Sequence, residues 1–151
     1  MAEILDVQAG STPINEIYSG STLVWSRGYK ALRWNFGWDP DNNDEIRECR
    51  MDQGSGPVVP AGAVNQHGSS WQTPDNAFDL NNFTGARSSG NPSLGWDFTG
   101  IEAFTRVGLR IGNNRTNVNL TIEGQNQDNS WSELVNVTQS FNANTDYWWN
   151  L

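Results

Sequence analysis

The sequence has only one cysteine, one histidine and one lysine, and each scarcity excludes a class of protein. Cys49 has no partner for an internal disulfide, so the fold must be stabilised by packing, by a bound metal or by assembly. A zinc site needs several histidine or cysteine ligands, and the chain does not supply them. Lys30 is the sole lysine in a chain of net charge −8, so we expect no basic surface for nucleic acid.

Long apolar runs and recognisable catalytic motifs are also missing. No stretch approaches the roughly 20 apolar residues of a membrane helix, so no membrane partner is expected. The N-terminus lacks the basic and apolar regions of a secretion signal. The motifs HExxH, GxSxG, CxxC and the Walker loop are absent. Nothing marks a catalytic pair among the 17 Asp and Glu residues, so a non-enzyme is favoured over a glycan hydrolase.

What the sequence does contain is a repeated alternation of apolar with polar or small residues. Residues two apart share one face of a β-strand, so each alternating stretch predicts a strand with one apolar face. Turn-forming sequences such as DPDNND, GNPS and IGNNRT separate the stretches, which indicates an all-β sandwich or barrel. The alternating residues are Leu32, Trp34, Phe36 and Trp38; Leu94, Trp96 and Phe98; Val107, Leu109 and Ile111; and Val118, Leu120 and Ile122.

Residues 1–28 have a different pattern. The tripeptide GST occurs at Gly10 and again at Gly20, and the two copies flank Ile14, Ile17 and Tyr18. This arrangement predicts a β-hairpin or two short strands, which are too short to bury a core of their own. The segment is therefore either an additional strand pair of the sandwich or a docking segment that packs on another chain. We slightly favour docking, and place the main domain at residues 29–151.

Three stretches resemble the discoidin, or F5/8 type C, family of galactose-binding-like domains. NAFDLNNFTGARSS is similar to that family's Ala-x-Asp-Gly-Asn…Thr…Trp loop, PSLGWDF to its Trp-Leu-x-Val-Asp strand, and IEGQNQDNSWSEL to its glycine-containing hairpin. ALRWNFGWDPDNNDEIRECRM resembles a hairpin of phage-encoded versions, in which the Glu-bearing strand comes first. The resemblance covers about residues 30–151. It implies an antiparallel β-sandwich of the jelly-roll type, circularly permuted.

In that family the loop similar to residues 76–89 commonly holds a structural Ca²⁺. Such an ion takes about six to eight oxygen ligands, several of them backbone carbonyls. Leu80 stands where the family has a glycine, which would allow a positive φ without steric cost, and Ala86 stands where it has a tryptophan. The alternative is an Asx turn held by Asp79, with Glu48 exposed. By resemblance, the candidate ligands are Glu48, Asp79, Asn81 and Thr84.

A glycan site is the second prediction, because this fold usually binds sugars on loops at one end of the sandwich. Aromatic rings stack on sugars, while planar polar side chains bind the hydroxyl groups. Each candidate also has a structural alternative: Trp71 would pack in the core, His67 would be a polar loop residue, and Arg87 would pair with a carboxylate. The candidates are Trp38, Asp39, His67, Trp71 and Arg87.

Residues 1–28 resemble a short leader found in phage virion proteins, through the pattern I-x-x-I-Y-x-G-S-x-x-V-W. Together the two resemblances imply a structural virion protein, either a capsid decoration or a tail or fibre component. It would dock on other virion proteins through residues 1–28, form a homo-oligomer and bind host-surface glycan weakly. The alternative is a free-standing carbohydrate-binding module outside any virion.

Overall fold

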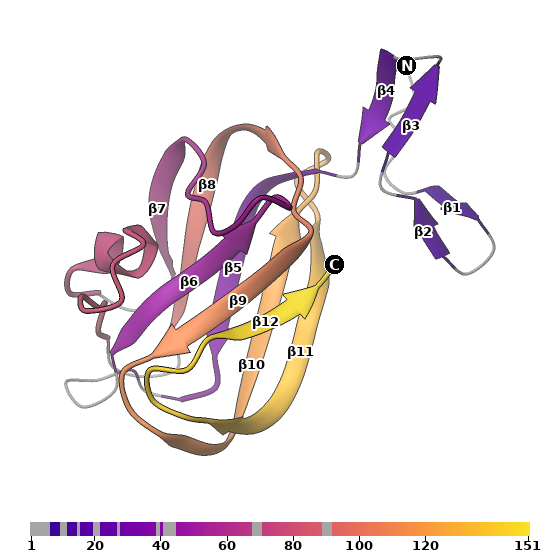
Figure 1. The fold of residues 1–151 in the computed structure, drawn as a ribbon. Helices are drawn as coiled ribbons and strands as arrows, with labels where there is room; N and C mark the ends of the chain where they lie inside the picture. Colours follow the sequence, from indigo (N-terminus) through magenta and orange to yellow (C-terminus); the bar gives the residue numbers. More distant parts are fainter. Residues whose placement is uncertain are drawn as a thin grey trace.

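Among the described residues, nearly all of the regular secondary structure is β-strand (Figure 1). The computed structural model describes residues 7–9, 12–14, 16–19, 22–26, 28–38, 40, 45–67, 71–88 and 92–151, with the backbone alone before residue 28 and at His67. Within these ranges, no helix is long and apolar enough to cross a membrane.

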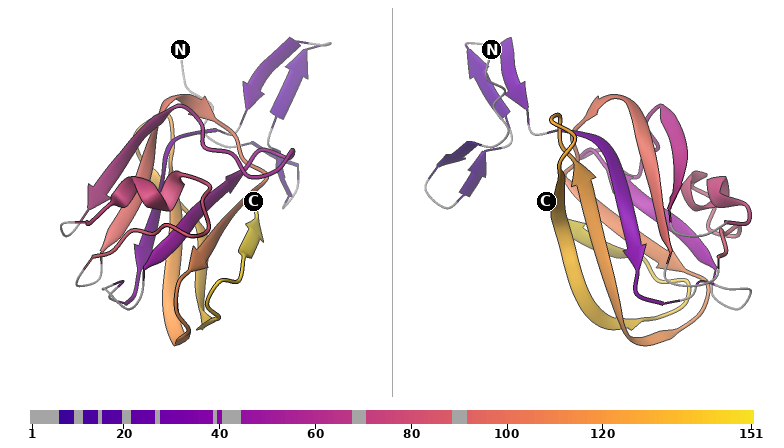
Figure 2. Two further views of the ribbon diagram at one scale, coloured as in Figure 1. Left: turned by 60° about the vertical axis from the view of Figure 1, so that its left-hand side comes forward. Right: turned by 180° about the vertical axis from the view of Figure 1, so that it is seen from behind.

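Two antiparallel sheets face each other and enclose the core (Figures 1 and 2). The larger sheet has the strand order β11-β10-β5-β8-β7, and the smaller one the order β12-β9-β6. The larger sheet consists of β5 (Tyr29–Phe36), β7 (Gly62–His67), β8 (Ser93–Glu102), β10 (Arg115–Gln125) and β11 (Trp131–Phe141). The smaller sheet consists of β6 (Ile46–Asp52), β9 (Arg106–Ile111) and β12 (Tyr147–Asn150). The prediction of an antiparallel β-sandwich is confirmed at this level.

The core forms where the alternating residues of the two sheets meet. Leu32, Trp34 and Phe36 of β5 are at most 2% exposed. Val107 and Leu109 of β9 are fully buried in the same cluster. Burying a side chain of this size stabilises the fold by about 1.5–3 kcal/mol. The residues that alternate in the sequence are thus the ones that form the core. The Trp34 Nε1 group also donates a hydrogen bond to the Gly108 carbonyl at 2.9 Å, which links the two sheets.

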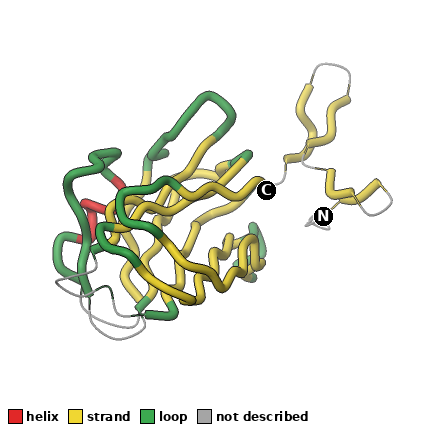
Figure 3. The backbone as a smooth tube through the Cα atoms, turned by 60° about the horizontal axis from the view of Figure 1, so that its bottom comes forward, coloured by secondary structure: helices red, strands yellow, loops and turns green. Residues whose placement is uncertain are grey.

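The N-terminal strands form two separate hairpins. One pairs β1 (Val7–Ala9) with β2 (Thr12–Ile14), and the other pairs β3 (Glu16–Ser19) with β4 (Thr22–Ser26). Neither hairpin joins either sheet of the sandwich, and both stand beyond the end at which β5 begins (Figures 1, 2 and 3). The interpretation of this segment as an additional strand pair of the sandwich therefore does not fit the structure.

One short 3-10 helix, η1 (Pro74–Phe78), lies between β7 and β8 in the sequence and packs against β6. Its last residue, Phe78, is 3% exposed. The Phe78 ring contacts Trp34 edge-on at 5.9 Å and Trp96 at 4.9 Å between ring centroids. This aromatic anchor fixes where the chain leaves η1, and so places the loop of residues 79–84 over β6.

Candidate cation-binding site beneath the 79–84 loop

Asp79 organises the loop of residues 79–84. One carboxylate oxygen accepts a hydrogen bond from the Asn81 backbone N–H at 2.8 Å, which makes an Asx turn. The other accepts one from the Thr84 hydroxyl group at 2.7 Å. The Thr84 backbone N–H donates to the Asn81 carbonyl at 3.1 Å. The predicted Asx turn is therefore present, and it brings the oxygen atoms of three of the four candidate ligands into one short loop.

Leu80 adopts the backbone conformation that a glycine would favour. Its φ is 57°, in the left-handed region, which costs an L-residue roughly 1–2 kcal/mol. The side chain is 45% exposed, so little burial offsets this strain. The loop therefore keeps the glycine-type turn although a leucine occupies the position.

A two-way backbone bridge holds the far end of this loop on β6. Ala86 and Ile46 each donate a backbone N–H to the carbonyl of the other at 2.9 Å. Asn82 adds side-chain contacts, because its carbonyl accepts from the Arg47 guanidinium at 3.1 Å and its side-chain oxygen accepts from Arg50 at 2.5 Å. Sequence reasoning did not identify Asn82, Arg47 or Arg50, and no motif signals their pairing.

Glu48 lies in β6 beneath this loop and is fully buried. Neither of its carboxylate oxygens makes a hydrogen bond of good geometry within the described residues, although the Asp79 side chain and the Asn81 backbone lie close enough to affect its protonation. Burial raises the pKa of Glu48 from 4.5 to about 8; the negative charge of Asp79 acts in the same direction, and the nearby Arg50 only partly opposes them. The expectation that Glu48 would be exposed if the loop were only an Asx turn is therefore wrong. The structure combines the Asx turn with a buried carboxyl group whose hydrogen bonds are incomplete.

These residues suit a hard cation better than a transition metal. All available donors are oxygens: the carboxylates of Glu48 and Asp79, the Thr84 hydroxyl and the Asn81 carbonyl. Calcium prefers such ligands, and its charge would offset the cost of ionising a buried carboxyl group. In the described part of the chain, no three His, Cys, Asp or Glu side chains gather into a metal site. An ion here would therefore rely on hydroxyl and carbonyl oxygens in addition to the two carboxylates, and Ca²⁺ binding stays a prediction.

The three glycan candidates whose side chains the structure describes, Trp38, Trp71 and Arg87, do not form an open site. Trp38 and Trp71 are each only 7% exposed and pack against Phe36, at 5.1 and 5.9 Å between ring centroids. Their burial corrects the prediction that they present ring faces to a sugar. Arg87 pairs with Glu45 at 2.9 Å, which is the alternative considered for it.

The other two glycan candidates give no support to that site. The backbone of His67 pairs with Ser93 at the end of β7, and its side chain lies outside the described part of the structure. Asp39 also lies outside the described residues. The predicted glycan site on these loops is therefore supported by the sequence pattern alone.

Comparisons with protein families, curated proteins and solved structures found no match for this chain. The resemblance to the discoidin family thus depends on the short motifs quoted above. Independently of that resemblance, the structure shows two antiparallel sheets, the turn at Asp79 and the buried carboxyl group of Glu48.

Proposed function

We propose that this chain is a structural protein of a phage particle, held in place by its N-terminal hairpins and displaying the β-sandwich. The observation that carries the proposal is that, among the described residues, β1–β4 pair with one another and with neither sheet of the sandwich (Figure 1). A segment so short cannot bury a core by itself, and the sandwich is complete without it. We infer that this segment docks on another chain.

The sequence of the hairpins fits this docking role. Ile14, Ile17, Tyr18, Leu23 and Trp25 lie within fewer than 15 residues of one another, and Ile17 pairs with Trp25 in the second hairpin. A fully buried leucine or isoleucine contributes about 1.5–3 kcal/mol, so a handful would hold the protein on a particle. The resemblance of this segment to phage virion leaders supports a virion as the partner.

The sandwich is proposed to be a circularly permuted, galactose-binding-like jelly roll. The chain enters it through β5, in the middle of the larger sheet, and leaves through β12, at the edge of the smaller one. A structural Ca²⁺ is proposed beneath the 79–84 loop, held by Glu48 and Asp79 together with Asn81 and Thr84. Bound there, the ion would neutralise Glu48 and fix the loop on β6.

The alternative, a free-standing carbohydrate-binding module, is expected to pack residues 1–28 on its own sandwich. The separate hairpins disfavour that arrangement. A glycan hydrolase would need two carboxyl groups facing each other across an open cleft. Glu48 and Asp79 do not meet this requirement, because Glu48 is fully buried.

The docking role can be tested by deleting residues 1–28. We expect the chain that begins at Tyr29 to keep a β-rich circular dichroism spectrum, and to sediment as a monomer under conditions in which the full chain forms an oligomer. A full-length variant with Ile17→Ser and Trp25→Ser should also fail to assemble, whereas the control Thr22→Ser should assemble normally. Equal assembly by the truncated and full chains would refute the docking role. A truncated chain that fails to fold would make the segment an integral part of the domain.

A further inference from the structure

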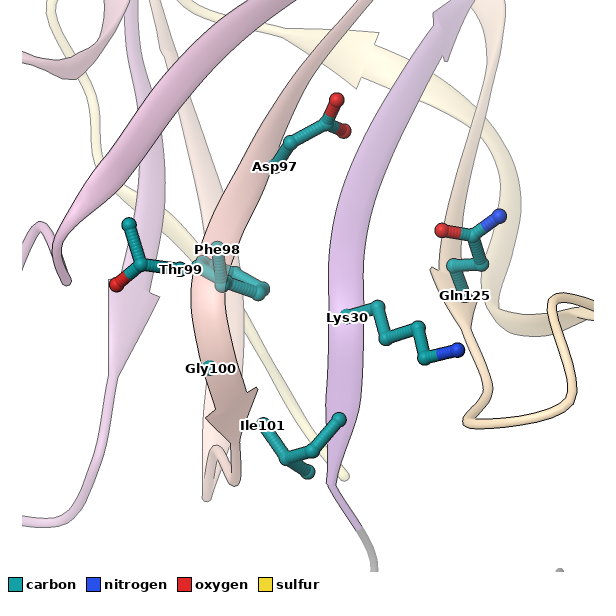
Figure 4. A pocket seen from close by; sticks show the side chains of 7 residues that line it. All are labelled: Lys30, Asp97, Phe98, Thr99, Gly100, Ile101 and Gln125. Atoms are coloured by element: carbon teal, nitrogen blue, oxygen red, sulfur yellow. The ribbon is translucent and has the colours of Figure 1, made fainter.

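A wide bulge in β8 opens a hollow on the outer side of the larger sheet. Asp97 of β8 pairs with Ala31 of β5, and Glu102 pairs with Tyr29. Lys30 alone lies between the two β5 positions, whereas residues 98–101 lie between the two β8 positions. The additional residues of β8 lean toward β7, where the Thr99 N–H donates to the Ala61 carbonyl at 2.9 Å. Bulges often occur next to functional sites, and this one leaves a hollow of about 390 Å³ (Figure 4).

Planar polar groups stand on both sides of this hollow. Asp97 on β8 and Gln125 on β10 both pair with Ala31, so a carboxylate and an amide flank a small residue (Figure 4). The Asn65 side chain donates to Asp97 at 2.8 Å, which fixes the orientation of the carboxylate. Lys30 is held toward the β10–β11 turn, where its ammonium group donates to the Asn129 side chain at 3.1 Å. These groups are therefore positioned before any ligand arrives.

The same hollow has an apolar wall. Ile101 is 43% exposed, and among the described residues it is one of only three large hydrophobic side chains with such exposure. Phe98 is partly buried, with its ring 5.2 Å from that of Phe104. The wall lies beside the carboxylate and the amide, and so the hollow combines an apolar surface with hydrogen-bonding groups of fixed orientation.

We propose that this hollow binds one pyranose ring of a neutral saccharide. A sugar ring has an apolar C–H face, which suits Ile101 and Phe98, and hydroxyl groups that both accept and donate hydrogen bonds, which suit Asp97 and Gln125. The single cation and the single anion in the hollow balance, and the chain as a whole carries a charge of −8, so an anionic sugar is disfavoured. The volume lies near the lower end of the range for small-molecule sites, which fits one ring. This site is separate from the loops that carry Trp71 and Arg87, and it does not depend on the proposed docking role.

Gly100 provides a way to block the hollow without disturbing the fold. Its φ is not in the left-handed region, and a Cβ atom placed on it would meet no atom within 4 Å. A Gly100→Phe substitution should therefore fill the hollow without strain. Thr116→Phe is the matched control, because Thr116 is exposed on β10 and lies nine residues, or roughly 30 Å of strand, from Gln125.

The experiment is a titration of the ¹⁵N-labelled full-length chain with methyl glycosides of glucose, galactose, mannose and N-acetylglucosamine, followed by backbone amide shifts. At least one sugar should shift the amides of Lys30, Gly100 and Ile101. Gly100→Phe and Asp97→Ala should each weaken that binding at least about tenfold, while Thr116→Phe leaves it unchanged. The proposal is overturned if no sugar shifts these amides, if the shifts appear only within residues 71–88, or if binding persists in both Gly100→Phe and Asp97→Ala.

Discussion

The effect of replacing Glu48 with glutamine on the free energy of unfolding should change sign with pH, because the buried carboxyl group destabilises the folded state only when it is ionised. Its pKa is raised from 4.5 to about 8, so the folded state binds the proton more tightly than the unfolded state does. In the absence of divalent ions, stability should therefore fall as pH rises from about 4.5 through about 8. A shift of this size corresponds to roughly 3–5 kcal/mol between the acidic and alkaline limits.

Glu48→Gln keeps the side-chain shape and removes this ionisation. In EDTA at about pH 9, the variant should be more stable than the parent by roughly 2–3 kcal/mol, since the buried glutamine amide is itself incompletely satisfied. At about pH 5, where the parent is protonated, the variant should be equally stable or slightly less stable. Urea unfolding at both pH values measures the difference, and Glu133→Gln, at an exposed position, is the control.

Calcium should remove this advantage of the variant. An ion that binds only the folded state stabilises it by about 2.7 kcal/mol at a concentration 100 times its Kd. The parent should gain this stability at neutral pH, and Glu48→Gln should gain little. A parent stability in EDTA that does not change between about pH 5 and about pH 9 would refute the burial argument. An equal gain from calcium in parent and variant would place the ion elsewhere.

Three further perturbations test the backbone and the ion pairs. Leu80→Gly should raise the free energy of unfolding by roughly 0.5–1 kcal/mol in a urea titration, because it relieves the positive φ; Asn144→Gly, at a φ of 57°, should gain less because asparagine tolerates that region. Asp52 accepts hydrogen bonds from the Gly54 backbone N–H and from Arg106, and these lower its pKa. Its stabilisation is therefore present above about pH 4 and is lost as pH falls through the lower folded value, so Asp52→Asn should flatten the acid limb of a pH–stability curve. Gly108→Ala should lose roughly 1–3 kcal/mol in thermal melts, because its Cβ would lie 2.4 Å from the Tyr147 carbonyl oxygen.

The strands could be predicted from the sequence because the alternation of apolar residues is a local signal. Leu32, Trp34 and Phe36 read as one face of a strand, and they form one face of β5 in the core. Burial of the opposite face of β6 could not be predicted in the same way. Glu48 lies on the face of β6 opposite to the core residues Cys49 and Met51, so the alternation predicts that it is exposed. It is buried because a loop more than 30 residues further along the sequence covers that face.

The ligand sites were harder to predict, since they depend on strand register and on long-range packing. Trp71 lies in a loop-like stretch of sequence, where an exposed ring could stack on a sugar. In the structure its indole N–H donates to the Ser93 carbonyl at 3.0 Å and its ring joins the core. The hollow beside Lys30 arises from a mismatch between β5 and β8, which no single-strand pattern reveals. The turn at Asp79 was predictable because an Asx turn is made within a few residues.

The most direct test of the docking role is a cryo-electron microscopy reconstruction of the full-length chain in its assembled form. We predict that density for β1–β4 lies against a neighbouring chain, with the sandwich projecting away from that contact. Density that places both hairpins on the sandwich of their own chain, with no neighbour in contact with residues 1–28, would contradict the account.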